Sequence, residues 1–276
     1  MTTGGCGSAT SSPGRRPLTE PLRSFLGDPD LVVFQATGPD DVRRVRREVE
    51  GRRWAESHGI PTAEVVAKDP HDRWLVSRRV DDVPGESPAY VEAALEVSER
   101  IQSLPHPRFA TPAATWRARR RSVPLRLARM LRYGIEPRAF AAARNEFAQL
   151  PSDTTAHNDF HRDNVLNTSA LGHVTVIDWE MASVGPRHHD AVMLIVDIGD
   201  ASLAHATWRT LVDAVAPGER ASLATQLRWL ALRTYASDVA VPPREREREK
   251  CEQRRTRWKE AQQWADELAG PAREHR

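Results

Sequence analysis

Three side chains that carry oxygen fall close together in this sequence, at Asp159, Asn164 and Asp178. Asp159 and Asn164 are five positions apart in a run bounded by apolar residues. Asp178 ends an alternating run that begins at Val174. Phosphoryl transfer to a hydroxyl needs a carboxylate that accepts the proton and oxygen ligands for Mg²⁺. Asp159 suits the first role, and Asn164 and Asp178 suit the second.

The runs around these residues resemble a known family. The chain reads H-N-D-F-H-R-D-N-V-L over 157–166 and V-I-D-W-E over 176–180, and Gly185 and Asp190 follow. These segments resemble the aminoglycoside phosphotransferase family, which also contains choline-kinase-like and other small-molecule kinases. Its usual pattern is H-G-D-x-x-x-x-N-x-L, then I-D-W/F, then G-x-x-x-x-D. The strong match covers roughly residues 155–195.

The resemblance implies an α+β, protein-kinase-like fold of two lobes, with a reduced N-terminal β-lobe and a mainly helical C-terminal lobe. The N-lobe is expected over 18–84, and the helical C-lobe with the catalytic loop over 85–276. Residues 1–17 are rich in Gly, Ser, Thr and Pro, which predicts a disordered tail.

Local patterns predict the elements that position the motif. Apolar runs indicate strands over 31–36, 64–67 and 74–80, and acidic residues begin a helix over 40–58. Ser202 is expected to cap a later helix. Further helices are predicted at 88–104, 113–121, 124–133, 137–150, 190–199, 202–216, 219–237 and 244–268.

The resemblance also assigns roles to residues. It implies that Mg²⁺ and ATP, or another nucleoside triphosphate, bind between the lobes, and that Asp190 is a structural carboxylate. His157 is expected with Asp159 at the catalytic centre, where it braces the loop. The residues expected to bind the nucleotide or its metal are Gln35, Glu48, Ser77, Arg78, Arg79, Asn164 and Asp178.

The sequence departs from the family pattern in both halves. Asn158 stands where a glycine is usual, and Asp163 where a glycine often precedes the asparagine. The lysine expected on the early strand is missing, with Gln35 near its place, and so is the glycine-containing hairpin ahead of it. Three explanations remain open: an arginine substitutes, the N-lobe is truncated and binds nucleotide weakly, or the protein is no longer a competent kinase. The candidate arginines are Arg43, Arg46, Arg78 and Arg79.

Two other classes compete with a kinase. A catalytically impaired, kinase-like protein could bind a nucleotide or small molecule without turning it over. A metal-dependent hydrolase would use the alternating His157, Asp159 and His161 together with the run at 188–190 as a transition-metal cluster. That reading leaves the placement of Asn164 unexplained.

Composition restricts the remaining classes. The chain is 39% hydrophobic and 28% charged, as in a soluble globular protein, and its net charge of +2 does not favour a nucleic-acid partner. It has no apolar run near the ~20 residues of a membrane span and no apolar core of a signal peptide. Two cysteines suggest a reducing cytoplasm.

The sequence leaves the identity of the hydroxyl acceptor open among an aminoglycoside-like antibiotic, a sugar and an amino alcohol. Carboxylates that could contact the acceptor are Glu180, Asp197, Asp200, Asp213 and Asp238.

Overall fold

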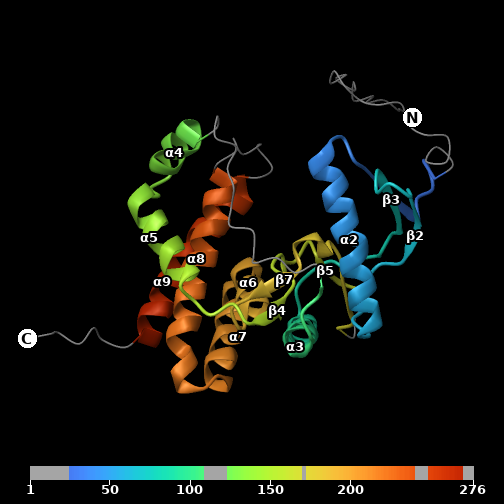
Figure 1. The fold of residues 1–276 in the computed structure, drawn as a ribbon. Coiled ribbons are helices and arrows are strands. Elements are labelled where there is room, and N and C mark those ends of the chain that lie inside the picture. The colour runs from blue at the N-terminus through green and yellow to red at the C-terminus, as the bar shows by residue number, and fades with distance from the viewer. Residues whose placement is uncertain (1–24, 109–122, 170–171, 240–247, 270–276) are drawn as a thin grey trace, which may run out of the picture. The chain divides into compact units, whose positions relative to one another are not determined.

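The structure is a computed structural model that describes residues 25–108, 123–169, 172–239 and 248–269 (Figure 1). The predicted tail and the predicted helix over 113–121 therefore lie outside the described residues.

The chain forms two compact units. Unit 1 comprises the described residues up to Arg46 together with Glu64–Arg79. Unit 2 comprises Arg47–Ala63 and the described residues from Val80 onward. Helix α2 (Pro39–Ser57) begins in unit 1 and continues in unit 2.

Unit 1 contains an antiparallel sheet in the order β1-β3-β2. Its strands are β1 (Leu31–Gln35), β2 (Val65–Lys68) and β3 (Trp74–Arg78). Trp74 and Val76 on the central strand form a small core, since that strand has neighbours on both sides. The three predicted strands are confirmed.

The start of α2 follows from its first residues. Asp40 and Asp41 lie in the first turn, where carboxylates stabilise the exposed N–H groups. The Asp41 carboxylate accepts a hydrogen bond of 2.9 Å from the backbone N–H of Thr37. The hydrogen bond from the Thr37 hydroxyl, together with that from its backbone N–H, lowers the pKa of Asp41. The acidic residues therefore begin the helix where the sequence predicts it.

The part of α2 that belongs to unit 2 packs closely on Trp179. Gly51 makes this approach possible, because a Cβ atom there would lie 2.6 Å from the Trp179 Cβ. The rings of Trp54 and Trp179 are 5.9 Å apart between centroids. Trp179 is fully buried, and it follows the metal-ligand candidate Asp178 directly.

Helix α3 (Pro88–Ser103) opens the part of unit 2 that follows residue 80. The Ser87 side chain accepts a hydrogen bond from the backbone N–H of Tyr90, and Pro88 occupies the first turn. Both features are favourable at a helix start, and the helix begins at Pro88, where the sequence predicts it.

Two short antiparallel ladders hold the segment of the motif. β4 (Thr154–Ala156) pairs with β7 (Ser183–Gly185), and β5 (Val165–Asn167) pairs with β6 (Val174–Val176). The prediction that Asp178 ends the second strand is wrong. The strand ends at Val176, because Asp178 turns into a left-handed conformation with φ 62°.

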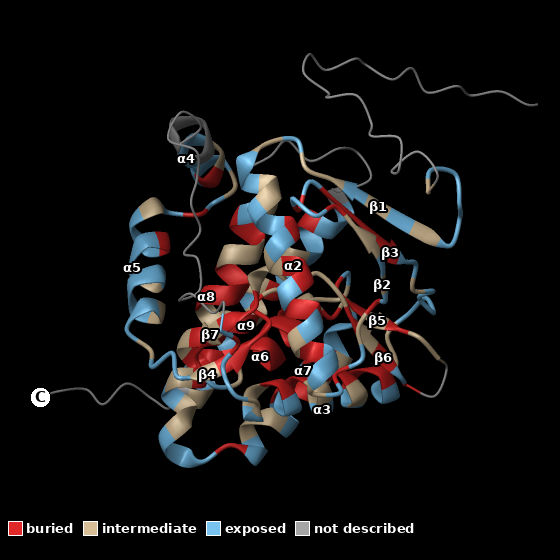
Figure 2. Ribbon diagram, turned by 45° about the vertical axis from the view of Figure 1, so that its right-hand side comes forward, coloured by how far each residue is buried: buried red, intermediate tan, exposed pale blue. Residues whose placement is uncertain are grey.

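Helices make up most of unit 2 (Figure 1). Helix α6 is buried along almost its whole length, and α8 packs against both α6 and α9 (Figure 2). The predicted cap Ser202 is wrong, because the side chain of Asp200 caps α7 by accepting from the Leu203 N–H at 2.8 Å. The helices of unit 2 that follow α3 are α4 (Val123–Arg132), α5 (Pro137–Ala148), α6 (His189–Asp197), α7 (Ala201–Ala214), α8 (Arg220–Val239) and α9 (Arg248–Ala269), with the short 3₁₀ helices η2 (Trp179–Met181) and η3 (Pro217–Glu219).

No helix among the described residues combines the length and the apolar character needed to cross a membrane.

Candidate active site

The loop between β4 and β5 brings Asp159 and Asn164 into direct contact. The Asn164 Nδ2 donates to the Asp159 backbone oxygen at 2.9 Å and to its carboxylate Oδ2 at 3.0 Å. Because the amide nitrogen is used in this way, the Asn164 Oδ1 remains the atom suited to a cation. The Asp159 side chain is 33% exposed, so a substrate can reach it.

The β5–β6 ladder brings Asp178 to the same end of this hairpin. Val165 pairs with Val176, and beyond that pair the Ile177 N–H donates to the Asn164 carbonyl at 2.9 Å. Asp178 follows Ile177 directly. One backbone hydrogen bond therefore joins Asn164 to the residue that precedes Asp178, although the two predicted metal ligands are fourteen residues apart in sequence.

A buried carboxylate fixes the start of the catalytic loop from behind. Asp190, the second residue of α6, accepts hydrogen bonds from the backbone N–H groups of His157 at 2.7 Å and Asn158 at 2.9 Å. Burial raises the pKa of Asp190 to about 7, although both N–H groups favour the carboxylate. This geometry agrees with the structural role that the resemblance implies.

The conformation of Asn158 explains why it can stand at the family's glycine position. Its φ is 65°, in the left-handed region that asparagine tolerates better than most residues with a side chain. The Asn158 Nδ2 donates to the Ser183 Oγ at 2.8 Å and to the Ala156 carbonyl at 3.1 Å. The side chain thereby ties the loop to β4 and β7, which a glycine could not do.

His157 is a structural residue of the loop. It is fully buried, its Nε2 donates to the Ile177 carbonyl at 3.0 Å, and its ring meets the Trp179 ring edge-on at 4.8 Å. Burial lowers the pKa of His157 to about 4, so the imidazole is neutral near pH 7. This placement favours bracing over proton transfer.

Two basic side chains act on Asp159: His161, which was considered only as a ligand of a transition-metal cluster, and Arg233, which was not predicted. The His161 Nε2 lies 3.5 Å from the Asp159 Oδ2, and the half-buried Arg233 on α8 also acts electrostatically on this carboxylate. Burial by itself would raise the pKa of Asp159, but His161, His157 and Arg233 together lower it. Asp159 is therefore ionised at neutral pH. The sequence does not indicate that Arg233 acts on Asp159, because Arg233 belongs to a helix that lies far from Asp159 along the chain.

Arg162 connects the catalytic loop to the segment before α3. Its two Nη atoms donate to both carboxylate oxygens of Asp82 at 2.9 and 2.8 Å, and its guanidinium lies 5.0 Å above the Tyr90 ring. Such a planar fork fixes orientation as well as distance. The Arg162 backbone N–H donates to the Asp197 Oδ2 at 2.9 Å, which ties the loop to the end of α6.

Comparison with known proteins identifies the family. Residues 19–230 match the model of the phosphotransferase enzyme family. The chain belongs to the phosphotransferase enzyme family. No curated protein matches the chain significantly.

Solved structures similar to this phosphotransferase confirm the predicted fold class. One is a choline/ethanolamine kinase family protein from Mesorhizobium loti, at 17% identity and a TM-score of 0.52, covering 87% of this chain and 86% of that chain. Another is a GDP complex of an aminoglycoside 2'-phosphotransferase, at 10% identity and a TM-score of 0.52, covering 88% and 86%. A third is an aminoglycoside phosphotransferase with ADP and hygromycin B, at 18% identity and a TM-score of 0.50, covering 79% and 83%.

Glu48, one of the residues expected to bind the nucleotide or its metal, has a side-chain partner on its own helix. Glu48, in the unit 2 part of α2, is buried and pairs with Arg52 one turn along the same helix. Burial raises the pKa of Glu48 above its usual value, although Arg52 opposes the shift. Arg52 also donates to the Ala63 carbonyl at 3.3 Å. Gln35 lies at the end of β1 in unit 1, opposite Trp74.

The remaining nucleotide candidates lie in unit 1. Ser77 is buried on β3, Arg78 pairs with Glu64 at 2.7 Å, and Arg79 donates to the Pro29 carbonyl at 2.6 Å. The other two arginines considered as lysine replacements are also engaged: Arg43 pairs with Asp40, and Arg46 pairs with Asp72 at 2.8 Å.

The His/Asp cluster that a metal hydrolase would need is not formed by the described residues, which contain no metal-holding group of three or more His, Cys, Asp or Glu side chains. His157 and Asp190 are instead bonded to the backbone. A magnesium site needs fewer protein ligands, such as one Asp and one Asn, because Mg²⁺ completes its shell with phosphate and water oxygens.

Proposed function

We propose that this phosphotransferase is a small-molecule kinase that transfers the γ-phosphate of ATP, or of another nucleoside triphosphate, to a hydroxyl. The observation that carries the proposal is the contact between Asp159 and Asn164, at 3.0 Å, at the end of the hairpin that leads to Asp178. The arrangement supplies one accessible carboxylate and two oxygen donors, which phosphoryl transfer requires.

Asp159 acts as the catalytic base in this proposal. It orients the acceptor hydroxyl for in-line attack and takes its proton as the bond to phosphorus forms. The hydrogen bond from Asn164 fixes the carboxylate, and the nearby positive groups keep it ionised. His157 and Asp190 act indirectly, by holding the loop backbone.

Asn164 and Asp178 fit a magnesium ion. Both offer hard oxygen donors, and the Asn164 amide is already turned so that its nitrogen faces Asp159. When bound, the ion supplies charge neutralisation for the triphosphate. The contribution of the chain is to orient these two oxygens beside the base.

The nucleotide contacts proposed for Gln35, Glu48, Ser77, Arg78 and Arg79 rest on the family resemblance. Use of a nucleotide is supported by the solved family structures that contain GDP or ADP. Gln35 brings no positive charge that could bind the phosphates.

A nucleotide-consumption assay over aminoglycosides, sugars and amino alcohols tests the proposal. We expect Mg²⁺-dependent consumption of ATP with at least one class, and loss of that activity in Asp159→Asn. Consumption that the variant retains in full would remove Asp159 from the mechanism.

A catalytically impaired binder is the second candidate, because Glu48 is paired with Arg52 and the early strand carries Gln35. It predicts a thermal shift with Mg²⁺ and ATP but no consumption with any acceptor. A thermal shift accompanied by turnover would reject it.

A further inference from the structure

Arg233 is a cation without a carboxylate partner close to the proposed catalytic base. It lies on α8, and its Nη2 donates to the sulfur of Met193 on α6 at 3.9 Å. Among the residues that the structure describes, no carboxylate forms an ion pair with this guanidinium and no carbonyl accepts a hydrogen bond from it. Asp159 nevertheless acts on it electrostatically, and Arg233 acts on Asp159 in return. The guanidinium therefore lies near the base without being bound to it.

This environment is unfavourable for a charge that has no ligand. Burial lowers the pKa of Arg233, because the guanidinium loses water that the weakly accepting Met193 sulfur does not replace. Part of the side chain stays exposed, so a ligand from solvent can reach it. An apolar residue would fill the same place between α8 and α6 without the cost of burying a charge. The unpaired charge therefore indicates an anion that comes from outside the described chain.

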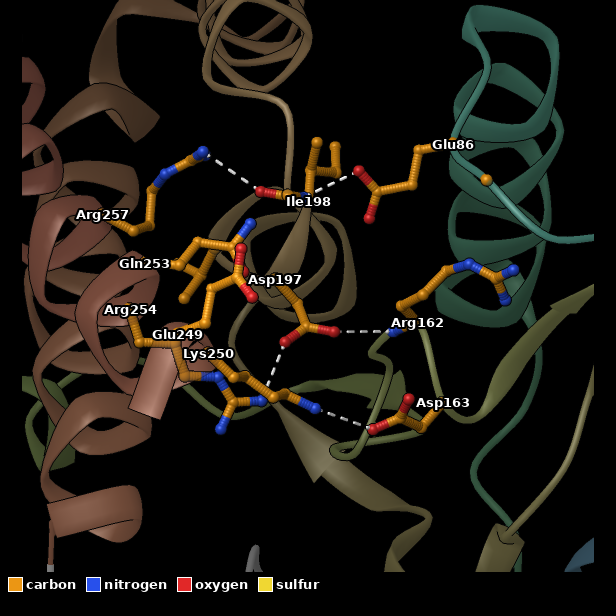
Figure 3. A pocket seen from close by; sticks show the side chains of 13 residues that line it. Glu86, Arg162, Asp163, Asp197, Ile198, Glu249, Lys250, Gln253, Arg254 and Arg257 are labelled. Carbon is orange, nitrogen blue, oxygen red and sulfur yellow. Dashed lines mark hydrogen bonds and ion pairs between the residues drawn. The ribbon is translucent and has the colours of Figure 1, made fainter. Parts of the chain in front are cut away.

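Other arginines of unit 2 with little exposed surface have oxygen partners. In the pocket drawn in Figure 3, Arg254 donates to the Asp197 carboxylate at 3.0 Å, and Arg257 donates to the Ile198 carbonyl at 3.1 Å. Both cations are thereby engaged within the chain. The fold thus supplies oxygen partners to these arginines, and Arg233 differs from them by its position beside the base.

The ionisable groups around Arg233 do not neutralise it. His189, one turn before Met193 on α6, is buried, and burial together with Arg233 lowers its pKa to about 3, so the imidazole is neutral. Asp159 is held by the Asn164 amide at 3.0 Å and forms no ion pair with Arg233. A positive charge is therefore left available beside the base.

The free oxygen of Asp159 indicates where an acceptor would lie. Its Oδ2 accepts the hydrogen bond from Asn164, and no described residue donates a hydrogen bond to its Oδ1. The Oδ1 atom is thus the one left for the hydroxyl of an acceptor. Arg233 can donate two parallel hydrogen bonds to a carboxylate. A hydroxyl and a carboxylate of one small molecule can then engage Asp159 and Arg233 together.

Helix α8 holds Arg233 in a fixed place. One turn earlier, the Trp229 ring packs on Phe140 of α5, with 5.1 Å between the ring centroids. Two residues later, Tyr235 stacks on Trp258 of α9 at 5.4 Å. A residue that selects a substrate needs such rigid support, because a loosely held side chain would adapt to many ligands.

We propose that Arg233 determines the acceptor specificity by binding a carboxylate group, so that the preferred hydroxyl acceptor is a hydroxy acid, such as a sugar acid. A carboxylate fits better than a phosphate, because one planar guanidinium matches a single negative charge. This inference rests on the proposed function. It disfavours choline-like and polycationic acceptors, which Arg233 would repel.

Kinetics with pairs of acceptors that differ at one carbon test the inference. We compare glucuronate with glucose and glycerate with glycerol, and add glucosamine as a cation. The proteins are wild type, Arg233→Met, Arg233→Lys and the control Arg228→Met, which removes an arginine of the same helix that pairs with Asp266 of α9. Thermal melts show whether each variant folds; if Arg233→Met does not, the comparison with Arg233→Lys carries the test.

We expect wild type to prefer the acids at least about tenfold in kcat/KM. Arg233→Met should raise the KM of the acids about tenfold or more, with the KM of the neutral partners and of the nucleotide unchanged. Arg233→Lys should give a smaller rise, because lysine keeps the charge but not the planar fork. Arg228→Met should behave like wild type.

The results separate the role of Arg233 from the kinase proposal. A preference for glucose, glycerol or glucosamine, or equal changes for acids and neutral partners in Arg233→Met, would overturn the role of Arg233 and leave the kinase intact. A rise in the nucleotide KM would place a nucleotide phosphate at this arginine and would overturn the role as well.

A binding measurement decides if no acceptor is consumed. Titration calorimetry with glucuronate is then carried out in the presence of Mg²⁺ and ATP. Binding that Arg233→Met weakens would support the carboxylate site even though the kinase proposal fails. Absence of binding, or binding that the substitution leaves unchanged, would reject the site together with the kinase.

Discussion

The candidate functional residues in the catalytic loop of unit 2 and those in the sheet of unit 1 differ in their burial and in the number of their partners. In the loop, buried residues with more than one partner hold the reactive groups: Asp190 binds two backbone N–H groups, and Asn164 binds Asp159 twice. In the sheet, Arg78 is an exposed side chain with one neighbouring carboxylate. Exposed pairs contribute little free energy, whereas a buried network fixes geometry.

This difference indicates that the proposed activity depends more on the residues of the catalytic loop than on those of the unit 1 sheet. The loop has little freedom to change, because Asp190 holds two of its backbone N–H groups and Asn164 holds Asp159 through two hydrogen bonds. Arg78 and Arg79 of unit 1 can vary, because a substitution there disturbs mainly solvent-exposed contacts. Loss of the early lysine is compatible with this pattern.

The largest expected effect is that of Asp159→Asn. Removing the general base should lower the turnover by about 10²–10⁴-fold. The amide keeps an oxygen for the Asn164 N–H, so the melting temperature should stay close to that of wild type. Steady-state kinetics and a thermal melt measure both, with the exposed Asp153→Asn as the control. Similar losses in both variants would contradict the comparison.

Asp190→Asn should weaken the support of the loop. An asparagine offers one acceptor oxygen where two buried N–H groups need partners, which costs about 1–3 kcal/mol of folding free energy. Turnover should fall with the stability. Chemical denaturation measures the change, and an unaltered free energy of unfolding would show that the loop does not depend on Asp190.

The same variant should alter the pH dependence of stability. Folded His157 has its pKa lowered to about 4, so the unfolded chain binds more protons between about pH 4 and 6.5 and stability rises with pH there. Asp190 opposes this, because its folded pKa of about 7 lies above the unfolded value. Asp190→Asn should therefore show the steeper rise of stability from pH 4.5 to 6.5. A slope equal to that of wild type would contradict the assigned shift.

Arg162→Lys should have a moderate effect. Lysine cannot form the planar fork with Asp82, so we expect a loss of about 1 kcal/mol, or roughly 2–4 °C in melting temperature, with a lower turnover. The matched control is Arg187→Lys, whose exposed pair with Glu219 should tolerate the change. Equal shifts in the two variants would remove the special role of the Arg162 fork.

The smallest effect is expected for Arg78→Ala in unit 1. Its exposed pair with Glu64 should contribute at most about 1 kcal/mol. Arg78 is exposed and its guanidinium is already paired with Glu64, so the nucleotide KM should also change little. A thermal melt and nucleotide kinetics check both; a clear rise in KM at unchanged stability would place the guanidinium on the nucleotide.

Much of this protein was determined by local sequence. The spacing of Asp159, Asn164 and Asp178 indicated phosphoryl transfer, and the family match and the fold class confirm the resemblance built on it. The start of α3 was also predictable, because Ser87 and Pro88 act within one helical turn. These features depend on neighbours in the chain.

Other features were decided only by the tertiary structure. The left-handed conformation of Asn158, the pairing of Glu48 with Arg52, the action of Arg233 on Asp159 and the end of the strand before Asp178 all depend on packing. Which carboxylates have partners also depends on the fold, because a partner can lie up to 87 residues away, as in the pair of Asp163 and Lys250. A sequence gives the number of charges, but burial and distance decide which of them stay available to a ligand.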